Sequence, residues 1–96
     1  MTVEEFKATL GRSQPPDGIS PLLLALWLDA KGDWQASHAI VQDMEAKDAA
    51  WVHAYLHRKE GDEFNAGYWY NRAGRVFSTA SFEEEWLKIV STNLKN

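Results

Sequence analysis

Two glycine–aspartate pairs, Gly32-Asp33 and Gly61-Asp62, constrain the fold of this 96-residue chain more than any other feature. Each pair separates two stretches in which apolar residues recur at the three- and four-residue spacing of a helix face. Glycine ends a helix readily because it tolerates a left-handed backbone, and aspartate caps the helix that follows. The pattern therefore predicts two helical hairpins, whose turns are 29 residues apart.

Six residues with capping side chains directly precede a stretch with helical periodicity: Thr2, Ser20, Asp33, Asp48, Asp62 and Ser81. They predict helices over residues 3–10, 21–31, 34–46, 49–59, 63–73 and from 82 onward. Glu5 and Glu84 complete two capping-box patterns, and Pro15-Pro16 predicts a loop over residues 11–18. No stretch alternates apolar and polar residues as a sheet strand would. The predicted fold is all-α: a single domain over residues 1–96, with a hairpin pair and an added helix at each end.

Composition and charge exclude several classes of protein. The chain has no cysteine, so disulfides and thiolate metal sites are excluded. Its net charge of −4 argues against nucleic-acid and anionic-membrane partners. The longest apolar run, residues 21–28, is far shorter than the ~20 residues that cross a bilayer, and the acidic N-terminus lacks the apolar core of a secretion signal. We therefore expect a cytoplasmic protein.

The second hairpin carries a small residue in its first helix, a glycine–aspartate turn, and a small–aromatic–small series in its second: Ala54, Gly61-Asp62, Ala66, Tyr70 and Ala73. In this it resembles a tetratricopeptide-like helical hairpin, which implies an array used for binding rather than chemistry. The first hairpin departs at Ser37, Val41 and Met44, and the spacing is shorter than the repeat's usual ~34 residues. The string WVHAYLHRKEGDEFNAGYWYNRAGR also resembles a signature of small uncharacterised bacterial proteins, a resemblance that implies no particular activity.

Histidines are the first candidates for chemistry. His53 and His57 are four residues apart on one expected helix, which is the spacing of helical metal-ligand pairs. A metal site would need further ligands from elsewhere, and the chain has no HExxH motif; His38 lies in the other hairpin. The structural alternative is that both histidines are partly buried and hydrogen-bonded.

A second candidate site combines hydrogen-bond donors, cations and an aromatic ring near the second hairpin. Its proposed members are His57, Arg58, Asn65, Trp69 and Arg72. The last three share a helix face by their spacing, and an arginine beside an aromatic ring can hold a carboxylate or phosphate. The structural alternative places Trp69 in the core and pairs the arginines with carboxylates of residues 60–63.

The functional prediction is a non-catalytic protein- or peptide-binding adaptor, because arrays of helical hairpins serve mostly for binding. The chain contains no nucleophile motif and no glycine-rich phosphate loop that would support an enzyme. We expect no cofactor and a protein or peptide as the partner. The alternative is a small-anion or metal-binding protein, possibly an enzyme, centred on His53, His57 and the nearby arginines. A third reading is a structural subunit of a homo-oligomer. The sequence leaves the ligand and the oligomeric state open.

Overall fold

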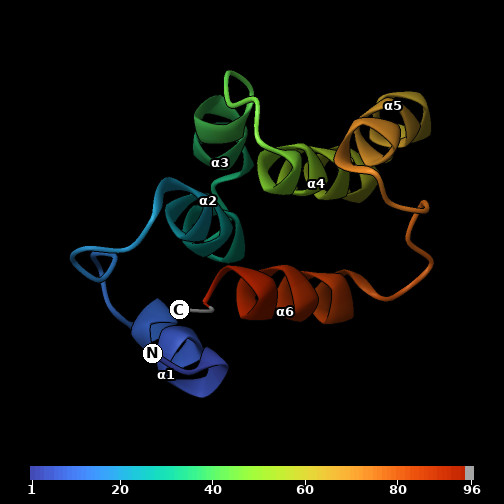
Figure 1. Cartoon of the computed structure of the whole chain (residues 1–96). Helices are drawn as coiled ribbons and strands as arrows, with labels where there is room; N and C mark the ends of the chain where they lie inside the picture. Colours follow the sequence, from blue (N-terminus) through green and yellow to red (C-terminus); the bar gives the residue numbers. More distant parts are fainter. Residues whose placement is uncertain (95–96) are drawn as a thin grey trace.

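All regular structure in residues 1–94, the part of the chain that the computed structural model describes, is helical (Figure 1). The helices α1 to α6 are Val3–Ala8, Pro21–Ala30, Trp34–Val41, Lys47–Lys59, Glu63–Ala73 and Phe82–Asn93. A 3-10 turn over Thr9–Gly11 extends α1. The all-α prediction is confirmed, with six α-helices in the described residues.

Both predicted glycine–aspartate turns are present. Gly32 and Gly61 have φ angles of +90° and +86°, a region that side-chain-bearing residues avoid. Asp33 and Asp62 then cap α3 and α5, each accepting a hydrogen bond from a backbone N–H in the first turn of its helix. The turns fold α3 back on α2 and α5 back on α4, and these two pairs form extensive helix contacts.

The region between α3 and α4 differs from the prediction. The third helix was expected to reach residue 46 but ends at Val41, because a turn follows in which Met44 N–H donates to the Val41 carbonyl at 3.1 Å. Asp48 is not a cap. Ala46 occupies that position with no side-chain hydrogen bond, and α4 begins at Lys47, two residues before the predicted start at residue 49. Asp48 therefore lies inside the first turn, where its negative charge complements the helix dipole.

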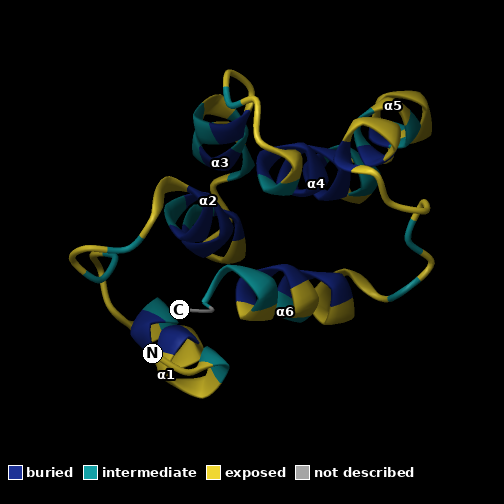
Figure 2. Ribbon diagram, in the orientation of Figure 1, coloured by how far each residue is buried: buried dark blue, intermediate teal, exposed yellow. Residues whose placement is uncertain are grey.

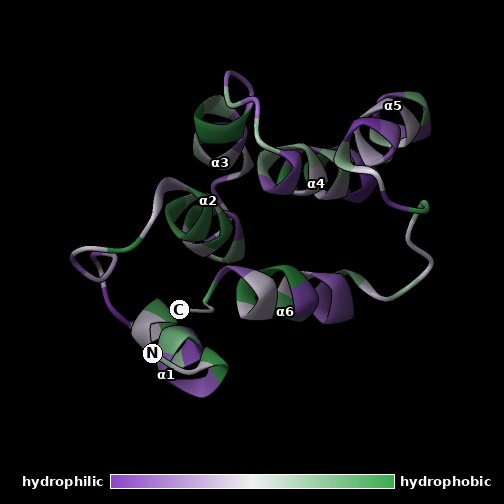
Figure 3. Cartoon of the chain, viewed as in Figure 1, coloured by the Kyte–Doolittle hydropathy of each residue, from purple (hydrophilic) through white to green (hydrophobic). Residues whose placement is uncertain are grey.

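The core is built around α4, which contacts α2, α3, α5 and α6. Figure 2 shows α4 as the most continuously buried helix, and its residues 49–56 are all buried. Figure 3 shows that α2 is predominantly hydrophobic, whereas polar residues cover much of α5. The central helix α4 therefore packs against both the apolar α2 and the more polar α5.

An extended connector over residues 75–81 leads from α5 to α6, which returns across α1, α2 and α4 (Figure 1). Ser81 caps α6 as predicted, but Glu84 accepts from the Ser81 hydroxyl instead of completing the reciprocal backbone bond. None of the helices described combines the length and apolar character that a bilayer crossing requires.

Candidate functional site

Three histidines converge where α3 packs against α4. His53 and His57 lie on one face of α4, and His38 of α3 faces them. The Nε2 atoms of His38 and His53 are 3.0 Å apart, and potential metal-ligating atoms of all three residues lie within 4.8 Å of one another. The helix-pair spacing of His53 and His57 was recognised from sequence, and His38 was noted in the other hairpin but not assigned to this pair.

Two tryptophans hold this histidine cluster in place. The Trp34 ring stacks on His38 with centroids 4.8 Å apart, and Trp69 of α5 stacks on His53 at 3.9 Å. Trp34 Nε1 donates to the Leu56 carbonyl of α4 at 2.8 Å. This hydrogen bond fixes the Trp34 indole, and the indole in turn holds the His38 ring on which it stacks.

The surroundings of His38 and His53 favour neutral imidazoles. Burial, followed by the charges that His38 and His57 would carry, lowers the pKa of His53 to about 4. Burial also lowers the pKa of His38, and His57 adds to the effect. The Nδ1 atoms of His53 and His57 are buried without a hydrogen-bond partner in the described residues. The nearest carboxylates to His57 Nδ1 are Glu60 at 3.4 Å and Asp62 at 3.9 Å.

The structure brings together part of the second candidate site, the one that combines hydrogen-bond donors, cations and an aromatic ring. Trp69 stacks on His53 and so adjoins the histidine cluster that contains His57, and the Arg72 guanidinium lies 5.2 Å from the Trp69 ring centre. Asn65 lies at the turn, where its amide donates to an Asp62 oxygen at 2.7 Å. Its hydrogen-bonding capacity is therefore partly used by the helix cap.

Arg58 points away from the other four predicted residues. It donates through two nitrogens, at 2.8 and 3.1 Å, to one oxygen of Glu85 on α6. The structural alternative for this arginine was therefore wrong about its partner, which lies 27 residues away instead of at residues 60–63. Burial opposes the charged form, but the hydrogen bond and charge of Glu85 dominate and raise the pKa of Arg58.

Glu85 is the centre of a buried polar hub that sequence reasoning missed. Its other oxygen accepts from the Trp51 indole at 3.1 Å and from the Tyr70 hydroxyl at 2.6 Å. Burial, then the hydrogen bond to Glu85, raises the pKa of Tyr70. The only signal for Glu85 was its place on the inner face of α6, one residue before Trp86.

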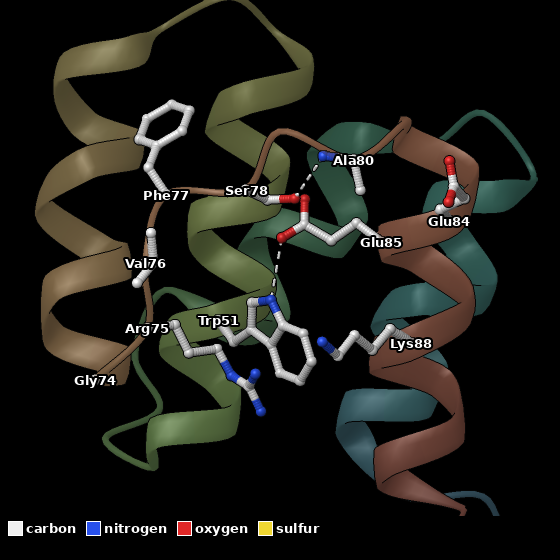
Figure 4. A pocket seen from close by; sticks show the side chains of 10 residues that line it. All are labelled: Trp51, Gly74, Arg75, Val76, Phe77, Ser78, Ala80, Glu84, Glu85 and Lys88. Carbon is white, nitrogen blue, oxygen red and sulfur yellow. Dashed lines mark hydrogen bonds between the residues drawn. The ribbon is translucent and has the colours of Figure 1, made fainter.

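A pocket of about 590 Å³ lies beside this hub, between α4, the connector and α6 (Figure 4). The Arg75 guanidinium lies 3.3 Å from the centre of the Trp51 ring, and Figure 4 shows the Lys88 side chain extending toward the same space. Neither cation forms an ion pair within residues 1–94. Nothing in the sequence singled out Lys88.

No known protein family, curated protein or solved structure matches this chain. The resemblance to a tetratricopeptide-like hairpin therefore stays a prediction. The geometry above gives two candidate sites, the histidine cluster and the pocket beside Trp51, which we call the connector pocket.

Proposed function

We propose that this chain is a non-catalytic binding module that holds an acidic, extended segment of a protein partner in the connector pocket. The observation that carries the proposal is that Arg75 and Lys88 border one pocket and pair with no carboxylate within residues 1–94. A guanidinium lying over an aromatic ring keeps its donors available for bidentate binding of a carboxylate.

Two carboxylates line the pocket, and Glu84 accepts a hydrogen bond from the Ser81 hydroxyl and pairs with neither cation within residues 1–94. Glu85 lines the pocket, but its two oxygens accept four hydrogen bonds from three side chains of α4 and α5. A carboxylate so fully bonded gains little from Arg75 or Lys88. The two cations therefore favour an acceptor from another molecule.

The connector supplies the features that an extended peptide needs. Val76 is 91% exposed and Phe77 is 36% exposed, which offers apolar contacts beside the cations. The backbone of residues 76–79 makes no backbone–backbone hydrogen bond in the described part of the chain. An extended partner segment can pair with such free backbone groups while its acidic side chains reach Arg75 and Lys88.

The experiment compares two pools of synthetic peptides with random flanking residues. One pool has aspartate or glutamate at two central positions, and the other has asparagine or glutamine there. We expect the acidic pool to bind more tightly, with an affinity that falls as salt is added. Arg75→Gln and Lys88→Gln should each weaken binding roughly tenfold.

Arg12→Gln is the matched control, because Arg12 is an exposed cation far from the connector pocket and should not affect binding. Equal binding of the two pools would contradict the proposal. So would an equal loss of affinity in the Arg12 and Arg75 variants.

A further inference from the structure

We infer that His38, His53 and His57 form a binding site for one divalent transition-metal ion. The site lies between α3 and α4 and shares no residue with the connector pocket. It is independent of the proposed peptide binding. Because all three ligands are imidazoles and the chain has no cysteine, the metal belongs to the nitrogen-preferring group that includes Zn²⁺, Co²⁺, Ni²⁺ and Cu²⁺.

The spacing of the rings carries the inference. In a tetrahedral site with metal–nitrogen bonds of about 2.0–2.1 Å, neighbouring ligand nitrogens are about 3.3 Å apart. The Nε2 atoms of His38 and His53 are 3.0 Å apart. The three ring centroids are 4.7, 4.9 and 5.3 Å from one another, a nearly equilateral arrangement around one point. One potential ligand atom from each of the three residues lies within 4.8 Å of the others, so the cluster already approaches the geometry of a shared ion.

The hydrogen bonding of the cluster is incomplete without such an ion. A neutral imidazole offers one donor and one acceptor, and both normally find partners when buried. The single contact between His38 and His53 leaves His53 Nδ1 and His57 Nδ1 without partners in the described residues. Three imidazoles converging with so few hydrogen bonds are better explained as ligands than as packing residues.

The groups around the cluster suit metal ligation. If His57 binds the metal through Nε2, its proton is on Nδ1, 3.4 Å from a Glu60 oxygen. This contact is not a hydrogen bond in the structure, but a carboxylate that accepts the Nδ1 proton of a ligating histidine would orient the ring and increase its basicity. Trp34 and Trp69 stack on the other two rings and restrict their rotation. His38 is only partly buried, which leaves a route for the ion from solvent.

Three protein ligands leave a fourth tetrahedral position open. Zinc sites that are purely structural usually have four protein ligands, whereas sites that bind water or a further ligand have three. The described residues offer no fourth side chain within the histidine set. A bound ion would therefore keep one coordination position for water or another exchangeable ligand.

The first test titrates Co²⁺ into untagged, chelator-treated protein at neutral pH. Tetrahedral nitrogen ligation should produce visible absorption bands that saturate at one equivalent, and Zn²⁺ should abolish them stoichiometrically. His38→Gln and His57→Gln should each reduce the affinity at least tenfold while keeping the helical circular dichroism spectrum. Absence of saturable bands, or unchanged binding by a folded His38→Gln variant, would overturn the inference.

Two carboxylate variants separate ligand orientation from general surface charge. Glu60→Gln should weaken Co²⁺ binding roughly 10–100-fold, because the orienting charge beside His57 is lost. Glu63→Gln removes the same charge from an exposed residue outside the cluster and should leave the affinity unchanged. Equal effects of the two variants would show that surface charge alone attracts the ion, and would contradict the site.

A measurement on the unmutated protein covers the case in which the histidine variants do not fold. The chain has only three histidines, so every histidine ring resonance belongs to the cluster. One equivalent of Zn²⁺ should shift the ring nitrogen resonances of all three. At a free Zn²⁺ concentration about 100 times Kd, the folding equilibrium constant should increase about 100-fold. A titration that moves fewer than three rings refutes the site.

Discussion

The Trp69 indole of α5 lies flat on the His53 imidazole of α4, with ring centroids 3.9 Å apart and planes 17° from parallel. The Trp69 indole covers one face of the His53 ring, and only 4% of the His53 surface is exposed. A proton added to this ring would place a charge in a dry site beside two other imidazoles. The packing of α5 on α4 is therefore coupled to the protonation of His53.

The unfolding free energy of the metal-free protein should fall as the pH is lowered from about 6.5, where an unfolded-state histidine titrates. In the native state the pKa of His53 is about 4, so the unfolded chain binds the proton first and the loss continues down to that pH. The slope should reach up to about 1.4 kcal/mol per pH unit from this residue. Urea unfolding between the two pKa values measures it. His53→Gln should flatten the curve, and an unchanged slope would disprove the coupling.

Glu85→Ala should lower the unfolding free energy by about 3 kcal/mol, because it leaves the partly buried Arg58 charge without a partner. Trp51 and Tyr70 lose their acceptor at the same time. Glu83→Ala is the control, since this exposed residue has one long ion pair and should change stability by less than about 1 kcal/mol. Denaturant unfolding of both variants gives the comparison, and similar losses would show that the hub is not stabilising.

Gly61→Val should cost about 1–2 kcal/mol of stability. The reason is conformational, because Gly61 has a φ of +86° although a Cβ there would meet no atom within 4 Å. Thermal melting checks the effect. A variant that melts like the parent protein would show that the turn changes its backbone easily.

Gly67→Ala should instead stabilise the protein, by up to about 1 kcal/mol. Gly67 lies inside α5 with an ordinary helical backbone, and an added Cβ would make only a 4.0 Å contact with the Phe77 ring. Chemical denaturation is the measurement. Destabilisation would mean that the Phe77 side chain cannot accommodate the methyl group.

Leu56→Ala should reduce the unfolding free energy by about 2–5 kcal/mol, because Leu56 is fully buried in the central helix. Leu28→Ala removes the same atoms from a residue that is only partly buried, and we expect a smaller loss. Equilibrium unfolding in denaturant measures the loss in each variant, and the m-values should be the same as in the parent protein. A larger loss for Leu28 would contradict the central position of α4.

The helices and turns were predictable because their causes are local. Ser20, Asp33 and Asp62 each accept a hydrogen bond from a backbone N–H three residues later, a relationship visible in a four-residue window. Asp48 was the exception, since the chain entered the helix one residue before it. A capping residue indicates a helix start only when its own backbone is non-helical, as it is at Asp33 and Asp62, and a sequence does not show that.

The sites were less predictable because their partners are distant in sequence. Arg58 pairs with Glu85, 27 residues away, and His53 meets His38, 15 residues away. Neither pairing follows from periodicity, because both depend on how α3 and α6 pack on α4. Only the contribution of a single helix, such as His53 with His57, was visible beforehand.

The Glu85 hub has a consequence for biosynthesis. Trp51, Arg58 and Tyr70 are made before Glu85, and all three donate to it. While residues 82–93 are still inside the ribosome, those donors have no acceptor from α6, and the hairpins lack the helix that covers them. The nascent chain therefore depends on water to accept hydrogen bonds from these groups until the last helix emerges, and a chain stopped before Glu85 would keep that dependence.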